Sequence, residues 1–137
     1  MKSTNRFVVD TNILISAMLF PCSVPALALK KVFDIGMVVI SKECADELTL
    51  VVMDEKFEKY VPFSMRQAFL LDFEDAVVFV NVKNKIAVCR DLKDDKYLSL
   101  AVSAKAKFII TGDNDLLILN PFKNISIITP AEFLKKF

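Results

Sequence analysis

Short apolar runs alternate along the chain with longer stretches of helical periodicity. We expect β-strands at the five apolar runs of strand length, residues 7–9, 37–40, 77–82, 108–110 and 125–128. We expect helices between and after them, over residues 25–33, 41–53, from 64 onwards, 94–105 and 130–137. Strands separated by helices favour parallel pairing through right-handed crossovers. The pattern therefore predicts an α/β fold, in which ligands bind beyond the carboxyl ends of the strands.

Capping residues stand at several of the expected helix starts. Ser41 fits an N-cap. Ser64 with Gln67, and Thr129 with Glu132, have the spacing of a capping box, in which a hydroxyl and a carboxyl or amide satisfy the first free N–H groups. These signals place the starts of the second, third and last expected helices.

Length and composition favour one domain over residues 1–137. Apolar residues make up 54 % of the chain, which suits a parallel sheet covered on both faces and also an apolar interface in an oligomer. The longest unbroken apolar run, Ala76 to Val80, is far shorter than the roughly 18 residues of a membrane span. The start of the chain is too short and polar for a signal peptide, so we expect a cytoplasmic protein.

The residue types that are absent restrict the chemistry. The chain has no histidine, which excludes Ser-His-Asp and Cys-His triads and nearly all catalytic zinc sites. Its three cysteines are widely spaced and its two glycines cannot form a phosphate-binding loop. The net charge of +1 neither supports nor excludes a nucleic-acid partner. Acid–base or metal chemistry must therefore rest mainly on Asp and Glu, whose oxygens suit Mg²⁺, Mn²⁺ or Ca²⁺.

Several acids fall where the expected strands end. Asp10 follows the first strand directly, and Asp113 and Asp115 follow the fourth strand. Asp94 and Asp95 open the helix before that strand. Each of them taken alone also fits a helix cap or a turn residue. Together they would repel one another and raise one another's pKa unless a cation neutralised them, which favours a divalent-metal site.

Glu47 stands out from the other acids because of its place on a helix. At 100° per residue, Cys44, Leu48 and Val51 form an apolar stripe, and Glu47 falls within it, whereas Asp46 lies off it. A carboxylate facing a core is costly unless it is paired, protonated or bound to a metal. The interpretations that remain open are that Glu47 is a metal ligand, that it meets a lysine, or that it lies at the edge of the stripe.

Four segments in order resemble the motifs of the PIN domain, a family of metal-dependent ribonucleases. They are Phe7–Asn12, Cys44–Leu48, Arg90–Leu98 and Ile110–Leu117. The resemblance covers essentially the whole chain. Each motif alone is weak, but the four together, in this order and with these lengths between them, are specific.

The resemblance implies a three-layer α/β/α sandwich with a central, mainly parallel five-stranded sheet. It implies one or two Mg²⁺ or Mn²⁺ ions, and it assigns catalysis and metal binding to the same four acids, Asp10, Glu47, Asp94 and Asp113. The side chains beside them that would orient them are Asn12, Thr111, Asp115 and Asp95. The third motif departs from the usual pattern, with Leu92 in place of proline and Asp95 in place of asparagine. Asp94 and Asp95 therefore compete for the third position, and the family's spacing to Ala101 favours Asp94.

The branch with this third motif resembles bacterial toxins of toxin–antitoxin pairs, which implies an RNA substrate, an antitoxin partner and a homodimer, with no membrane. A haloacid-dehalogenase-like phosphatase is an alternative, but Asn12 stands where its general acid belongs. A response-regulator-like receiver would need a phosphoacceptor after the third strand, where Lys83 follows instead. A non-catalytic binding module would tolerate the loss of Glu47 or Asp113, and both are present.

Overall fold

The centre of the protein is a five-stranded parallel sheet. The computed structural model describes residues 5–83, 85–89 and 92–137, so Arg90 and Asp91 of the third motif lie outside the described residues. The strands are β1 (Arg6–Val9), β2 (Met37–Ile40), β3 (Val78–Phe79), β4 (Phe108–Ile110) and β5 (Ser126–Ile128). Their order across the sheet is β3-β2-β1-β4-β5, and every neighbouring pair is parallel.

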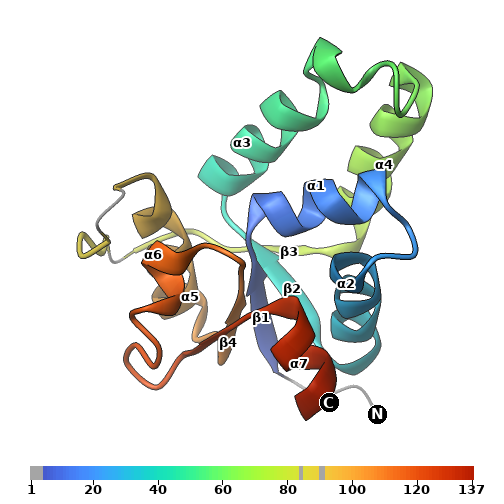
Figure 1. Ribbon diagram of the computed structural model, residues 1–137. Coiled ribbons are helices and arrows are strands. Elements are labelled where there is room, and N and C mark those ends of the chain that lie inside the picture. The colour runs from blue at the N-terminus through green and yellow to red at the C-terminus, as the bar shows by residue number, and fades with distance from the viewer. Residues whose placement is uncertain (1–4, 84, 90–91) are drawn as a thin grey trace.

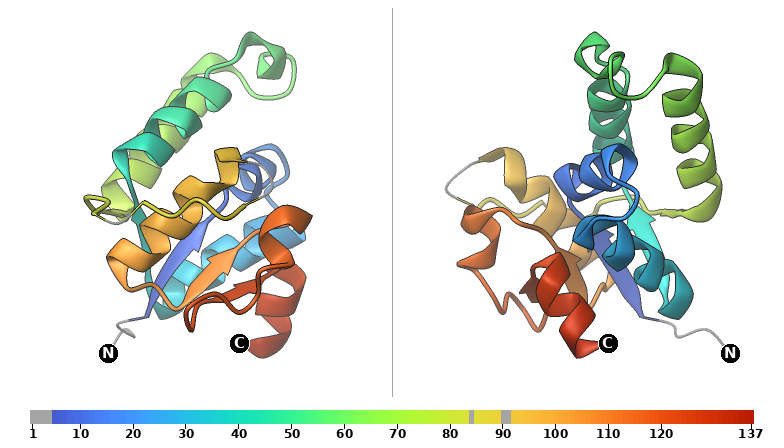
Figure 2. Two further views of the ribbon diagram at one scale, coloured as in Figure 1. Left: turned by 90° about the vertical axis from the view of Figure 1, so that its left-hand side faces the viewer. Right: turned by 45° about the vertical axis from the view of Figure 1, so that its right-hand side comes forward.

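Helices cover both faces of this sheet (Figures 1 and 2). They are α1 (Thr11–Leu19), α2 (Val24–Ile35), α3 (Lys42–Val52), α4 (Phe63–Ala76), α5 (Asp95–Ala104), α6 (Asn114–Leu117) and α7 (Pro130–Lys136). Helix α5 packs on β1, β2 and β4, whereas α2 packs on β2 and contacts both α1 and α7 on the other face. Helices α3 and α4 form a hairpin that projects from the sheet (Figure 1). The α/β/α sandwich with a central five-stranded sheet is thus confirmed.

An aromatic cluster joins the middle of the sheet to the last helix. The rings of Phe7 and Phe108 stack at 5.2 Å between adjacent strands, and Phe133 meets Phe7 edge to face at 5.6 Å. All three side chains are buried. Removing the apolar surface of each one from water contributes roughly 1.5–3 kcal/mol to the stability of the fold. The capping box expected at Thr129 and Glu132 is present and orients α7 onto this cluster.

Gly36 lets α2 turn directly into β2 beside the first strand. A Cβ atom at this position would lie 2.6 Å from the carbonyl oxygen of Asn5 and 2.6 Å from the ring of Phe7. The backbone there is extended, so the requirement is for space and not for an unusual φ angle. Glycine is needed because another part of the backbone passes too close for any side chain.

The third strand is much shorter than the 77–82 expected from its apolar run. After β3 the backbone N–H of Val80 still bonds to the carbonyl of Ile40. Beyond it the chain leaves the sheet and bonds to α5, where Lys83 N donates to Ser103 Oγ and Ile86 N donates to Ser99 Oγ. Serine hydroxyls on a neighbouring helix replace the backbone partners that a longer strand would have had.

Two helix starts differ from the expectation. Helix α1, directly after β1, was not expected, because it is buried at most positions and so lacks a polar face that would reveal its period. Helix α4 begins at Phe63 with Pro62 as N-cap, so the capping box expected at Ser64 and Gln67 is wrong. The carbonyl of Pro62 accepts the first helical bonds, and this places Ser64 inside the first turn.

No single helix among the described residues has the length and apolar character to cross a membrane. Helices α1 and α2 meet those two criteria only when joined, and a bend of 111° separates them.

Candidate active site

The acids expected at the strand ends lie where the direction of the sheet reverses. From β1 the chain builds the sheet outward through β2 and β3, and then returns to place β4 on the other side of β1. Asp10 follows β1, and Thr111 and Asp113 follow β4. The carboxyl ends of two adjacent strands that lead to opposite sides form a crevice, where open α/β sheets bind their ligands.

Asp10 is held rigidly at the centre of this crevice. Its Oδ1 accepts a hydrogen bond of 3.1 Å from the backbone N of Asn12, so Asp10 also caps α1. Its Oδ2 accepts a hydrogen bond of 2.7 Å from Thr111 Oγ1, which in turn accepts one of 3.0 Å from the backbone N of Asp113. Thr111 is fully buried and ties the acid after β1 to the acid after β4.

Three carboxylates converge beside Asp10. Asp94, Asp113 and Asp115 each offer an oxygen, and these three oxygens lie within 4.8 Å of one another. Asp94 is buried, with 7 % of its surface exposed. Asp115 N donates 2.8 Å to Asp113 Oδ1, so Asp113 caps α6. Asp115 is therefore a member of the carboxylate cluster, in addition to the orienting role that the resemblance implies for it.

The adjacent acids Asp94 and Asp95 point to different surroundings. Asp95 Oδ1 accepts hydrogen bonds from the backbone N of Val88 at 3.0 Å and of Cys89 at 2.8 Å. Burial would raise the pKa of Asp95, but these N–H groups and the Cys89 thiol lower it further than burial raises it. Asp95 therefore anchors the segment before α5, and Asp94 is the one of the two that joins the acidic cluster.

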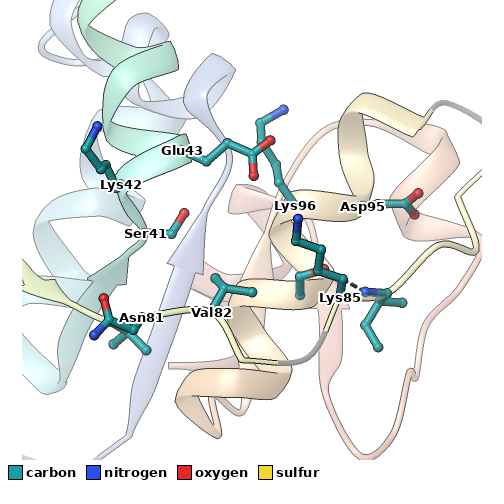
Figure 3. Close-up of a pocket in the computed structure, with 11 residues that line it drawn as sticks. Ser41, Lys42, Glu43, Asn81, Val82, Lys85, Asp95 and Lys96 are labelled. Atoms are coloured by element: carbon teal, nitrogen blue, oxygen red, sulfur yellow. Dashed lines mark hydrogen bonds between the residues drawn. The ribbon is translucent and has the colours of Figure 1, made fainter.

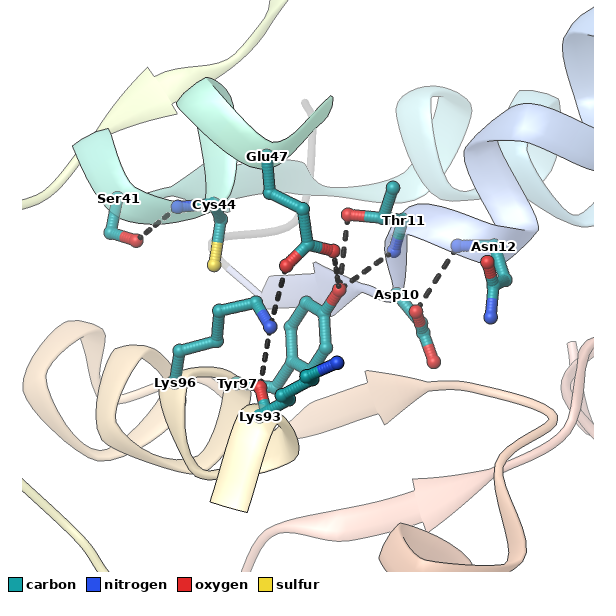
Figure 4. Close-up of polar contacts among 9 residues, drawn as sticks. All are labelled: Asp10, Thr11, Asn12, Ser41, Cys44, Glu47, Lys93, Lys96 and Tyr97. Atoms are coloured by element: carbon teal, nitrogen blue, oxygen red, sulfur yellow. Dashed lines mark hydrogen bonds and ion pairs between the residues drawn. The ribbon is translucent and has the colours of Figure 1, made fainter. Parts of the chain in front are cut away.

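Glu47 reaches the site from α3 and is paired with a lysine (Figure 4). Its Oε2 lies 2.6 Å from Lys96 Nζ, and its Oε1 accepts a hydrogen bond of 3.0 Å from the Tyr97 hydroxyl. Its side chain is 33 % exposed, whereas the side chain of Asp46 is 65 % exposed and pairs with Lys42 at 3.2 Å. The helical face separates the two acids as expected. The buried stripe is Cys44, Leu48 and Val52, with Val51 at its edge.

Tyr97 connects Glu47 to the start of α1. Its hydroxyl accepts a hydrogen bond of 3.2 Å from the backbone N of Thr11 and lies 3.0 Å from Thr11 Oγ1 (Figure 4). Burial, followed by the charge of Asp10, raises the pKa of Tyr97 far above its ordinary value. The phenol therefore stays protonated and can donate to the Glu47 carboxylate.

Lys96 stays charged in this environment. Burial would lower its pKa, but the hydrogen bond and charge of Glu47 raise the pKa above its ordinary value. Its side chain is largely buried, and its Nζ also bonds to the carbonyl of Lys93.

Helix ends reduce the repulsion between the acids. Asp10 precedes α1, and Asp94 precedes α5, so both stand at helix N-termini, where the helix dipole favours negative charge. Asp94 makes no side-chain cap bond to α5, and its carboxylate lies in the cluster with Asp113 and Asp115.

A hollow of about 310 Å³ opens between the start of α3, residues 80–82 and 85–86, and α5 (Figure 3). Its wall includes the side chains of Lys42, Lys85 and Lys96 together with Glu43. Lys96 lines this hollow and also pairs with Glu47.

The sequence pattern did not single out Lys96 or Tyr97. Tyr97 carried a weak signal, because it lies on the buried stripe of α5 with Leu98 and Ala101, and a buried phenol needs a polar partner. Lys96 carried none, since a lysine in a helix most often faces solvent.

The residues present fit a divalent ion. The donors are carboxylate oxygens only, and one of them, Asp94, is buried beside two further acids. Hard cations such as Mg²⁺ and Mn²⁺ prefer oxygen ligands of this kind.

Comparison with known proteins identifies the family. The PIN domain family matches residues 6–115, and the chain therefore belongs to the PIN domain family, whose members are in general nucleases that use divalent metal ions. An uncharacterized protein of Methanocaldococcus jannaschii, MJ1680, is 33 % identical over 142 residues, covering 96 % of this chain and 91 % of that protein.

Two solved structures share the fold at 16 % sequence identity. A chain in the crystal structure of VapBC2 from Rickettsia felis bound to a DNA fragment from their promoter aligns with a TM-score of 0.63, covering 90 % of this chain and 98 % of that chain. PAE2754 from Pyrobaculum aerophilum aligns with a TM-score of 0.66, covering 98 % of this chain and 90 % of that one. Family membership leaves the phosphatase and receiver alternatives without support.

Proposed function

We propose that residues 1–137 form a single metal-dependent endoribonuclease domain that acts in the cytoplasm. The observation that carries this proposal is the convergence of Asp94, Asp113 and Asp115 within 4.8 Å, beside Asp10 at the switch point of the sheet. In a chain without histidine, such a cluster favours cleavage of a phosphodiester through a bound cation.

The acids of the proposed centre are Asp10, Glu47, Asp94 and Asp113, and the site that they form binds one or two Mg²⁺ or Mn²⁺ ions. Thr111 and the backbone of Asn12 orient Asp10, and Asp115 orients Asp113 through its backbone N. Asp95 fixes the segment that leads into α5. A divalent ion bound there supplies an activated water and offsets the charge of the phosphate.

The protein's own groups determine where the substrate lies. RNA brings one negative charge per phosphate to a site that is itself acidic, so it needs positive groups nearby. Lys85 and Lys96 line the hollow between α3 and α5, and Lys96 also contacts Glu47, so this hollow can receive a phosphate next to the cleaved one. Attack by water at phosphorus forms one P–O bond and breaks the P–O bond to the leaving ribose oxygen, and that oxygen takes up a proton in exchange for the one that the water loses.

Cleavage of RNA should depend on both the metal and Asp10. We expect a panel of labelled single-stranded RNAs incubated with the protein and Mn²⁺ to yield discrete products. EDTA should abolish them, and added Mn²⁺ should restore them. Asp10→Asn should give none, although an asparagine can keep the helix cap and the contact with Thr111. Cleavage in EDTA, or cleavage by Asp10→Asn at the wild-type rate, would contradict the proposal.

We further propose an antitoxin partner and a homodimer, with this chain as the toxin. The likeness to the VapBC2 chain and the resemblance of the third motif to bacterial toxins support it. Exposed apolar side chains on α4 and the loop before it are available for such contacts, namely Tyr60, Phe63, Met65 and Leu71. A partner that covers the acids should suppress products in the same RNA assay.

A further inference from the structure

The four acids that the resemblance assigns to the metal divide into two groups in the structure. Asp94 and Asp113 lie in the carboxylate cluster, and Asp10 is joined to it through Thr111. Glu47 is outside the cluster, and each of its carboxylate oxygens already has a partner, Lys96 for Oε2 and Tyr97 for Oε1. An ion at Glu47 would therefore have to share a carboxylate oxygen with the Lys96 ammonium or with the Tyr97 hydroxyl.

The Lys96 ammonium is held in place from three directions. It lies 2.6 Å from Glu47 Oε2, it donates to the carbonyl of Lys93, and it lies 4.8 Å from the centre of the Tyr97 ring. An ammonium has three donors and a compact charge, so contacts with a carboxylate, a carbonyl and an aromatic face fix its position. Helix α5 thus presents a fixed positive charge two residues after Asp94.

We propose that the Lys96 ammonium takes the place of a second divalent ion, so that this chain binds one ion, on the aspartates, and Glu47 holds the ammonium. The proposal rests on the proposed function, and it gives Glu47 a different task from the one that the resemblance implies. Lys96 is then a positioning residue that supplies permanent positive charge on the α3 side of the site. A cation at Glu47 and the ammonium would compete for the same carboxylate, and the ammonium is already bound there.

The number of bound ions tests this directly. The titration with Mn²⁺ is monitored by calorimetry and by the electron paramagnetic resonance signal of free Mn²⁺. We expect it to give one bound ion per wild-type chain. Lys96→Met removes the charge and keeps most of the side-chain volume, so it should bind two ions per chain, a twofold rise. The double variant Lys96→Met with Glu47→Gln should return to one, because the second ion needs the Glu47 carboxylate.

Lys42→Met is the matched control. Lys42 also pairs with an acid of α3, Asp46, but both side chains are exposed, so this variant should still bind one ion. Circular dichroism confirms the fold of each variant, and Lys96→Gln replaces Lys96→Met if the latter does not fold.

Two ions on the wild type, one ion on Lys96→Met, or two on the double variant would each overturn the inference while leaving the proposed metal site intact. No Mn²⁺ on the wild type would overturn the proposed metal site, and this inference with it.

Discussion

Glu47→Gln is expected to lower RNA cleavage by about 100-fold per folded molecule, whereas Asp46→Asn leaves cleavage unchanged. The two acids are neighbours on α3, but only Glu47 reaches Lys96 and Tyr97. An amide at Glu47 keeps the shape and the contact with Tyr97 but removes the negative charge that holds the ammonium. Asp46 is an exposed acid paired with Lys42, and its loss should matter by less than about 0.5 kcal/mol.

Cleavage is measured on the fraction of each variant that is folded, as determined by circular dichroism. This separates a part in the reaction from a part in stability. If Glu47 is only a paired structural charge, Glu47→Gln will unfold more easily but its folded molecules will cut RNA normally. Equal cleavage by both variants per folded molecule would remove Glu47 from the site.

Arg66→Met is expected to lower the free energy of unfolding by about 2–4 kcal/mol without changing cleavage per folded molecule. Arg66 is only 2 % exposed and closes the hairpin of α3 and α4. Its Nη1 donates 2.9 Å to the carbonyl of Val52 and its Nε donates 3.0 Å to the carbonyl of Val61. A methionine fills the space but leaves both carbonyls without this donor, and each such loss costs about 1–3 kcal/mol.

Glu58→Gln is the control for Arg66. Glu58 pairs with Arg66 Nη2 at 2.5 Å, but its side chain is 58 % exposed, so solvent screens the pair. This variant should lose less than about 1 kcal/mol in urea unfolding. A similar loss in both variants would mean that the ion pair, and not the bonds to the two carbonyls, stabilises the hairpin.

Sequence patterns predicted the apolar central strands and the amphipathic helix α3. Helix α3 and strands β2 and β4 lie where their patterns placed them, and the helical face of α3 correctly separated Glu47 from Asp46. The same reasoning missed α1, because burial on most sides removes the alternation that reveals a helix. The apolar pattern also predicted a longer β3. The chain after β3 bonds to Ser99 and Ser103 of α5, and these partners lie too far along the sequence for a local pattern to reveal them.

The candidate site was predictable to the extent that strand ends determine it. Parallel strands bring their carboxyl ends to one edge, so Asp10 and Asp113 could be placed together from the sequence. Asp94 and Asp95 could not be separated by spacing alone. The backbone N–H groups of Val88 and Cys89 draw Asp95 away from the cluster, and they belong to a segment with no sequence signal. The pairing of Glu47 with Lys96 joins two helices and needed the tertiary structure.

The stability of the protein in Mn²⁺ tests the metal site most directly. If the carboxylates bind a divalent ion, Mn²⁺ at 100 times its dissociation constant should stabilise the wild type by about 2.7 kcal/mol, seen as a higher melting temperature. Asp113→Asn should melt at or above the wild-type temperature without metal, because it relieves repulsion with Asp94 and Asp115, and it should lose most of the gain in Mn²⁺. A wild-type melting temperature that does not change at high Mn²⁺ would contradict the metal site.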